Sequence, residues 1–111
     1  MEKISIQISY NILDILCDLY NDVMEYDKKN PSEIQFNKGF KANKNIIDLL
    51  FVRLKKEVIS KAGTNKLIKL SFKYYQAYFL INFISENITF VKGIYEQNLM
   101  LSFTSQIHEE L

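Results

Sequence analysis

The only cysteine and the only histidine of the chain are Cys17 and His108, so a thiol–imidazole pair is the first chemistry to consider. A nucleophilic cysteine needs a polar, partly open setting and a base within hydrogen-bond reach. Cys17 stands between Leu13 and Tyr20 in an apolar helical pattern, which is a different setting. The pattern therefore predicts a buried thiol rather than a catalytic one.

Four acidic residues recur at spacings of 4, 4 and 3: Asp14, Asp18, Asp22 and Glu25. On a helix they share one face, and clustered carboxylates can bind hard cations such as Mg²⁺. They occupy the polar arc of that helix, however, and the Glu-x-x-His pairs of di-metal bundles are missing, because Ser105 stands three residues before the only histidine. A solvated face is the favoured interpretation. No metal or cofactor is predicted, and with no glycine-rich phosphate loop the chain is predicted not to be an enzyme.

Lysine is concentrated in the middle of the chain. Residues 1–27 carry six acids and one Lys, residues 28–73 carry twelve bases and three acids, and residues 74–111 carry four acids and one Lys. Lysine neutralises nucleic-acid phosphates without reading sequence, whereas base reading usually relies on arginine, of which Arg53 is the only example. The middle segment thus predicts an alternative function, non-sequence-specific nucleic-acid binding. Its candidate contacts are Lys44, Lys55, Lys66, Lys69 and Lys73. Ordinary solvation of helical faces explains the same lysines and is favoured.

A cluster of aromatic residues occupies positions 74–83. Its members are Tyr74, Tyr75, Tyr78, Phe79 and Phe83. A core position is the default for such a cluster, but tyrosine is also common at interfaces, where it offers apolar area with a polar tip. The predicted helices at 42–61 and 65–86 carry more apolar arc than a four-helix monomer needs. The cluster is therefore the candidate interaction site, and the sequence favours a homo-oligomer, with a dimer first.

The segment KISIQIS at residues 3–9 fits two structures. Its isoleucines alternate with serine and glutamine, as in a half-buried strand. A helical period accounts for the same residues and continues to residue 26, so a helix is predicted over residues 3–26. In that helix Ser5 and Ser9 lie on the buried side, where small side chains allow close helix packing.

The remaining elements are also predicted to be helical. The chain breaks at Asn30-Pro31 and at Gly63. Helices are predicted at 42–61, 65–86 and 89–110, with a short strand at 88–92 as the main alternative. Because the chain has only three Gly and one Pro, a many-stranded fold would lack turn signals. The sequence therefore predicts a single all-α domain over residues 1–111, a four-helix, mostly antiparallel bundle.

Composition suggests where such a domain works. The apolar stretch at 74–84 is too short and too polar to span a bilayer, and no secretion signal is seen, so a cytoplasmic protein without membrane contact is expected. The expected function is that of a small non-enzymatic interaction protein, such as an adaptor, an inhibitor or a regulatory subunit. It would bind another macromolecule, a protein first, and self-associate.

Overall fold

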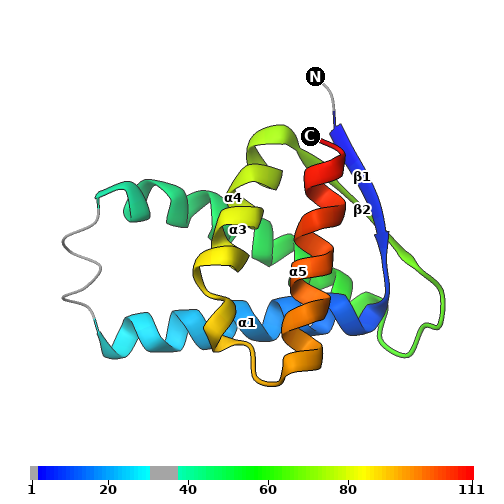
Figure 1. Cartoon of the computed structure of the whole chain (residues 1–111), viewed down its shortest axis with the longest axis horizontal. Coiled ribbons are helices and arrows are strands. Elements are labelled where there is room, and N and C mark those ends of the chain that lie inside the picture. Colours follow the sequence, from blue (N-terminus) through cyan, green and yellow to red (C-terminus); the bar gives the residue numbers. More distant parts are fainter. Residues whose placement is uncertain (1–2, 31–37) are drawn as a thin grey trace.

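The computed structural model describes residues 3–30 and 38–111, with the side chains of helix α3 described from Asn45 onward (Figure 1). The elements in chain order are β1 (Lys3–Ile8), α1 (Tyr10–Lys29), α3 (Lys38–Ser60), β2 (Ile68–Lys73), α4 (Tyr74–Glu86), the 3-10 turn η1 (Ile88–Phe90) and α5 (Ile94–Glu109). This part of the chain is mostly helical with one two-stranded antiparallel sheet. The helical class is confirmed, and the sheet is the part that the all-α prediction lacks.

The predicted helix over residues 3–26 is wrong at its start, because Lys3–Ile8 form strand β1. β1 pairs antiparallel with β2, and Ile6 lies opposite Leu70. The isoleucines of β1 are buried while the residues between them are exposed, which is the alternation of a half-buried strand. As a strand, all three isoleucines face one side and pair with the buried side of β2; in a helix they would divide between two stripes. Ser5 is therefore exposed, with its Oγ 3.1 Å from Oγ of Ser71.

Helix α1 begins at Tyr10 because Ser9 caps it. The backbone of Ser9 is extended, and its Oγ accepts a hydrogen bond from the N–H of Ile12 at 3.3 Å. The predicted role of Ser9 as a small residue on a buried helical face is therefore wrong. At the other end, Asn30 Nδ2 donates to the carbonyl oxygen of Tyr26 at 2.9 Å, which satisfies one of the last carbonyl groups of the helix.

The predicted helix over residues 65–86 is wrong in its first part, where Ile68–Lys73 form strand β2. Its apolar residues are buried and its lysines are exposed. The strand passes directly into α4 at Tyr74, and the N–H of Lys73 donates to Oε1 of Gln76 at 2.9 Å. This bond closes the first turn of α4, so the change from strand to helix needs no loop.

The strand considered at residues 88–92 is also wrong. Ile88–Phe90 form a single 3-10 turn, and α5 begins at Ile94 instead of residue 89. Gly93 precedes α5 with φ = 95°, a backbone angle that residues with a side chain rarely adopt. The helix predicted at 42–61 is present as α3, Lys38–Ser60, and begins earlier than expected.

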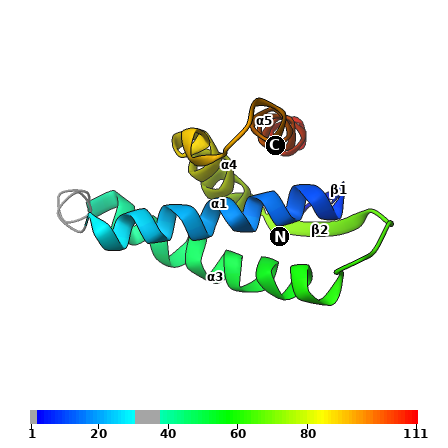
Figure 2. The same ribbon diagram turned by 90° about the horizontal axis from the view of Figure 1, so that it is seen from below.

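The helices form two antiparallel pairs that cross one another. In Figure 1 the chain runs in opposite directions along α1 and α3, and again along α4 and α5. Figure 2 shows the α4–α5 pair on one side of α1 and α3 on the other. Because the two pairs cross, an aligned four-helix bundle is not confirmed. The space between them is filled by large side chains, and Phe51, Phe72 and Phe103 are almost completely buried.

Both strands of the small sheet also contact helices. Nη2 of Arg53 in α3 donates to the carbonyl oxygen of Ser71 in β2 at 2.7 Å. Nε2 of Gln106 in α5 donates to the carbonyl oxygen of Gln7 in β1 at 3.2 Å. A two-stranded sheet is marginal alone and its edges can pair with other chains, so these bonds tie both strands to the helical part.

Candidate interaction surface

The aromatic cluster of α4 divides between the surface and the core. Tyr74, Tyr75 and Tyr78 are 41%, 46% and 55% exposed. Phe79 is partly buried against the core, and Phe83 is buried, with its ring centroid 5.5 Å from that of Phe51. Residues 74, 75 and 78 point outward from α4, while residue 83 lies on the opposite, inward side of the helix. The sequence thus grouped two kinds of residue, and only the tyrosines form an accessible face.

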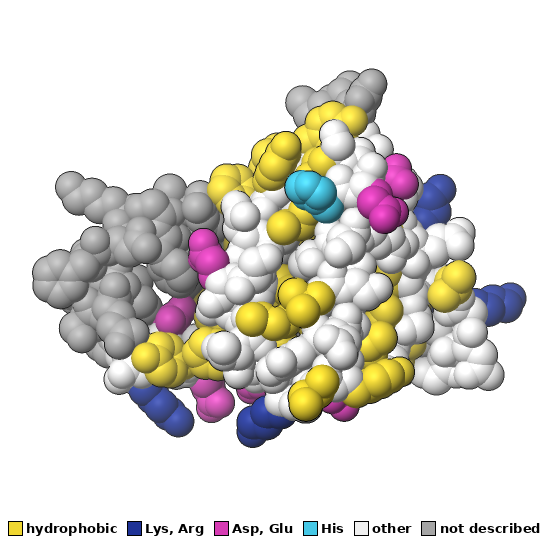
Figure 3. Space-filling model, viewed as in Figure 1, with side chains coloured by type: hydrophobic (Ala, Val, Ile, Leu, Met, Phe, Trp, Pro, Cys, Tyr) yellow, Lys and Arg dark blue, Asp and Glu magenta, His cyan; other side chains and the backbone are white. Residues whose placement is uncertain are grey.

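A shallow crevice lies between α4 and α5, beside the accessible face of α4. It has a volume of about 320 Å³ and is lined by Ile81, Thr104, Ser105, His108 and Glu109. The hydroxyl of Thr104 donates to the carbonyl oxygen of Leu101 at 2.7 Å, so its proton is used within the helix. Figure 3 shows the histidine between hydrophobic side chains on one side and acidic side chains on the other.

The sequence did not predict this crevice. The signal available to it was the spacing of residues 104, 105 and 108, which puts a hydroxyl pair and the imidazole on one flank of a helix. The side of α5 that meets α4 could not be read from that spacing. We call the three tyrosines together with this crevice the α4 face.

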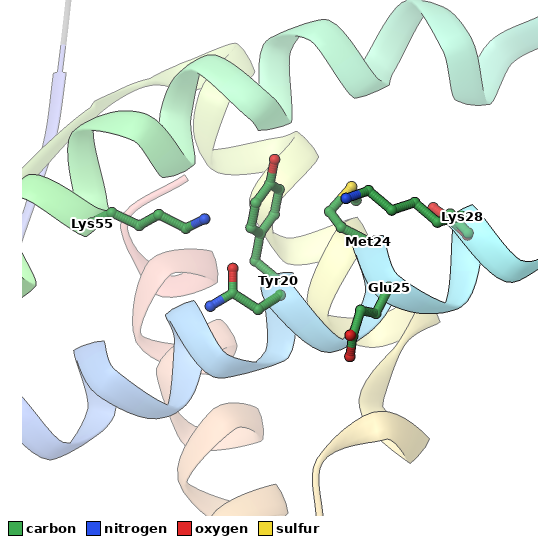
Figure 4. A pocket seen from close by; sticks show the side chains of 7 residues that line it. Tyr20, Met24, Glu25, Lys28 and Lys55 are labelled. Atoms are coloured by element: carbon green, nitrogen blue, oxygen red, sulfur yellow. The ribbon is translucent and has the colours of Figure 1, made fainter.

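A second depression, of about 660 Å³, lies between α1 and α3. It is lined by Tyr20, Asn21, Met24, Glu25, Asp27, Lys28 and Lys55. In Figure 4, Lys55 extends from α3 toward Tyr20, Lys28 folds along α1 toward Met24, and Glu25 points away. The groove is therefore an opening lined by polar and charged side chains, with the ring of Tyr20 as its aromatic floor.

Tyr20 forms that floor through contacts within the protein. Its hydroxyl donates to Oδ1 of Asp48 at 2.6 Å, and its ring stacks on Phe51 with centroids 4.4 Å apart. Nζ of Lys55 lies 4.8 Å from the centroid of the same ring, within the range of a cation–π contact. Burial, followed by the hydrogen bond to Asp48, raises the pKa of the Tyr20 hydroxyl well above its usual range. Tyr20 therefore stays protonated and joins α1 to α3.

The candidate lysines do not all share one surface. Lys69 and Lys73 are exposed on the outer side of β2, and Lys66 is exposed in the connection just before it. Lys55 lies instead in the α1–α3 groove, and the side chain of Lys44 lies outside the described residues. Lys3 also lies on the outer side of the sheet, directly opposite Lys73 in the strand register. It was not among the contacts predicted from the sequence.

The acidic residues of α1 and its single cysteine lie where the sequence predicted them. Asp18, Asp22 and Glu25 are exposed to solvent, and Cys17 lies on the buried side of the helix. Burial, then Asp14 and Asp22, raise the pKa of Asp18. In the described part of the chain, no group of three or more His, Cys, Asp or Glu side chains is arranged to hold a metal ion. Cys17 is buried, and burial raises its pKa to about 11, so it carries no thiolate at neutral pH.

Within residues 3–30 and 38–111, no helix has both the length and the apolar character to cross a bilayer.

Comparison with other proteins adds no functional assignment. No protein-family model matches the chain, and neither the curated proteins nor the solved structures include a significant match. The geometry of the surface is therefore the basis for a functional proposal.

Proposed function

We propose that the chain is a non-enzymatic interaction module, working in the cytoplasm as an adaptor, inhibitor or regulatory subunit, and that it binds protein through the α4 face. The observation that carries the proposal is the exposure of Tyr74, Tyr75 and Tyr78 on the outer side of one helix. Tyrosine supplies large contact area with few rotatable bonds and a polar tip, which is why it is enriched at interfaces. The crevice beside these residues offers a place for a partner side chain.

Self-association through the same face is part of the proposal. The chain has a mass of 13.1 kDa, so a dimer has a mass of about twice that value. Light scattering across a concentration series is expected to detect a dimer, and the variant Tyr74→Ser/Tyr78→Ser is expected to be monomeric. Tyr95→Ser is the matched control, because Tyr95 is an exposed tyrosine in the first turn of α5, more than two turns before the crevice residues of that helix. A wild-type monomer at high concentration would contradict self-association.

Binding to other proteins has its own test. A photoactivatable phenylalanine analogue is placed at position 78 and, as a control, at position 95, in the cells that produce the protein. A discrete crosslinked adduct at position 78 and none at position 95 is the expected result. Equal adducts at both positions, or no adduct at position 78, would contradict the use of the α4 face.

A nucleic-acid-binding function is the second candidate, and one feature of the sheet favours it. Lys3 and Lys73 lie directly opposite each other on the outer side of the sheet, next to Lys69. Like charges in opposed positions destabilise a strand pair, and a bound phosphate would relieve that repulsion. We expect binding of mixed-sequence DNA or RNA at low salt, weakened by Lys3→Ser/Lys73→Ser and unaffected by Lys92→Ser. Absence of binding at low salt would remove this candidate.

A further inference from the structure

The outer face of the two-stranded sheet consists of lysine, serine and glutamine side chains. Its outward positions form three cross-strand pairs, which are Lys3–Lys73, Ser5–Ser71 and Gln7–Lys69. The apolar residues between them are buried on the opposite side of the sheet. No acidic side chain stands at an outward position of either strand, so the face is positively charged.

Backbone bonds at the two edges of the sheet show how close these pairs are. In antiparallel strands, pairs that exchange backbone hydrogen bonds alternate with pairs that do not, and the second kind lies closer together. The carbonyl oxygens of Ser71 and Gln7 accept bonds from helix side chains, so they point away from the partner strand. The Oγ atoms of Ser5 and Ser71 are only 3.1 Å apart. The outward pairs, Lys3–Lys73 among them, are therefore the closer kind.

The Lys3–Lys73 pair brings two positive charges together at one end of the sheet. Like charges in directly opposed positions disfavour strand pairing. Neither lysine forms an ion pair with a carboxylate in the part of the chain that the structure describes. Both lysines are exposed, and Nζ of Lys73 lies 6.0 Å from the ring centroid of Tyr75. An anion bound between the two lysines pairs with both charges and removes their repulsion.

The serine pair beside the lysines adds a hydrogen-bond donor. One of the two hydroxyls of Ser5 and Ser71 donates to the other, which leaves the hydrogen of the second hydroxyl to donate outward. The lysine and serine pairs are two residues apart along the strands, about 7 Å, a distance that a lysine side chain spans. Two ammonium groups and one hydroxyl can therefore donate to three oxygen atoms of one phosphate group.

The charge of the lysine pair indicates which kind of phosphate group it suits. A phosphate monoester, such as phosphoserine, carries about −1.5 to −2 charges at pH 7 and has three free oxygen atoms. Each diester of a nucleic-acid backbone carries one negative charge. Two lysines that meet at one point match the monoester, whereas a diester neutralises only one of them.

The position of the pair indicates where the monoester comes from. Strand β2 passes into α4 without a loop, so Lys73 directly precedes Tyr74. In Figure 1 the start of β1 and the first turn of α4 lie at the same end of the sheet. The contact of Lys73 with the ring of Tyr75 makes the lysine pair continuous with the α4 face.

We propose that Lys3 and Lys73, with the hydroxyls of Ser5 and Ser71, bind the phosphate of a phosphorylated serine or threonine in a protein that docks on the α4 face. This inference rests on the protein-binding function proposed above and adds its regulation, because the partner then binds according to its phosphorylation. The four residues are called the phosphate site below.

The phosphate site is tested with probes too short to reach across the α4 face. Proton–nitrogen correlation spectra are recorded during titration with a blocked glycine–phosphoserine–glycine tripeptide, its unphosphorylated form, inorganic phosphate and dimethyl phosphate, which is a diester. The phosphorylated tripeptide is expected to shift the amide signals of residues 3–5 and 71–73 to saturation. Dimethyl phosphate is expected to bind about five-fold more weakly or less, and the unphosphorylated tripeptide is expected to cause no shift.

The variant Lys3→Gln/Lys73→Gln keeps two long side chains and removes both charges. It is expected to weaken binding of the phosphorylated tripeptide about ten-fold or more, and Ser5→Ala/Ser71→Ala is expected to weaken it about three-fold. The matched control is Lys56→Gln/Lys92→Gln, which removes the same net charge from two exposed lysines elsewhere. This control is expected to leave binding unchanged.

Several results would overturn the proposal. An absence of shifts at the sheet, equal affinity for dimethyl phosphate, or equal weakening by the control variant would show that the pair is not a monoester site. Tighter binding of inorganic phosphate than of the phosphorylated tripeptide would show that the ligand is free phosphate, not a partner residue. Tyr74→Ser/Tyr78→Ser is expected to leave tripeptide binding unchanged, so failure of the α4 face and failure of the phosphate site are distinguishable.

Discussion

Tyr20 is the residue whose contacts connect the two long helices most directly. Its hydroxyl lies 2.6 Å from Oδ1 of Asp48, its ring stacks on Phe51, and Lys55 lies over the same ring. A buried aromatic ring contributes mainly through area removed from water, and the hydroxyl contributes only through the bond it makes. The two contributions can therefore be measured separately.

The variant Tyr20→Phe keeps the ring and removes the hydrogen bond to Asp48. We expect the free energy of unfolding to fall by about 1–2 kcal/mol, since the acceptor is a carboxylate. Urea unfolding followed by far-ultraviolet circular dichroism measures this, and the slope of free energy against urea is expected to stay unchanged. Tyr95→Phe, at an exposed position, is the control with no expected change. Equal stability of Tyr20→Phe and the wild type would contradict the role of the bond.

Cys17 gives the protein a pH dependence that can be predicted with its sign. Burial raises the pKa of the folded thiol from 9.0 to about 11, with Lys55 opposing the rise and Asp14 and Asp18 adding to it. Below pH 9.0 the thiol is protonated in both states and has no effect on stability. Between pH 9.0 and about 11 only the unfolded state loses this proton, so the free energy of unfolding falls, by about 2 kcal/mol.

The variant Cys17→Ala isolates this contribution, because every other titratable group is the same in the two proteins. The difference in unfolding free energy between wild type and Cys17→Ala is expected to be constant below pH 9.0 and to change by about 2 kcal/mol as pH approaches 11. Urea unfolding across this pH range measures it. Parallel pH profiles of the two proteins would show that the thiol is not held in its neutral form.

The strands show what a single sequence reveals at the scale of an element, and where it stops. Helices α1, α3, α4 and α5 all overlap predicted helices, because each keeps a 3.6-residue apolar period over several turns. β1 and β2 are six residues each and lie far apart in the chain, so the pairing that stabilises them is not a local property. The sequence did contain a signal for this pairing. The segment IKLSFK at 68–73 alternates between apolar and polar residues as KISIQI does, and it forms the strand that pairs with KISIQI.

The same limit applies to the aromatic cluster of α4. At 3.6 residues per turn its five members spread over an arc of about 180°, so they cannot all lie on one narrow side of the helix. Spacing separates Tyr74 and Tyr78 from Phe83, but the side that faces the core depends on α3 and α5, which pack there. The sequence could therefore predict which residue types form the cluster, but not which of them face the core and which face solvent.

Neighbouring substitutions in β1 distinguish a strand from a helix. Ile6 is buried and Ser5 is exposed, on opposite faces of the strand. We expect Ile6→Ala to lower the free energy of unfolding by about 2–5 kcal/mol, whereas Ser5→Val is expected to change it by about 0.5 kcal/mol or less. In a helix over residues 3–26, Ser5 would lie on the packed side and the added methyl groups would destabilise it. A clear loss of stability for Ser5→Val would therefore contradict the strand.

The turn that starts α5 depends on Gly93. Its φ of 95° is unfavourable for a residue with a side chain, and an added Cβ would collide with the carboxylate of Glu96. Gly63 has a similar φ of 82°, but a Cβ there would meet no atom within 4 Å. The carboxylate of Glu96 is the end of a flexible side chain and can turn away, so the backbone angle sets the cost at both positions. We expect Gly93→Ala and Gly63→Ala each to lower the free energy of unfolding by about 1–2 kcal/mol. Thermal unfolding compares the pair, and a clearly larger loss at Gly93 would show that Glu96 is held in place.

At the scale of the whole molecule, every described helix and strand contributes to one buried cluster. The core includes Ile4 from the start of the chain, Phe51 from α3 and Phe103 and Ile107 from α5. The bond from Gln106 to the carbonyl oxygen of Gln7 joins the last helix to the first strand. A core shared in this way makes the elements depend on one another, so the described part of the chain is expected to unfold as one unit.

Two core substitutions far apart in the sequence test this dependence. Ile4→Ala in β1 and Phe103→Ala in α5 each remove side-chain volume from the cluster, at costs of about 2–5 and 3–5 kcal/mol. A domain of this size has a total stability of about 5–15 kcal/mol, so either substitution removes a large fraction of it. Each is expected to lower the midpoint of a single unfolding transition. The midpoints measured by circular dichroism and by tyrosine fluorescence are expected to coincide. Leu101→Ala, at an exposed position of α5, is expected to have little effect. If Ile4→Ala shifted only part of the circular dichroism signal, the sheet would unfold independently of the helices, and the single cooperative unit would be disproved.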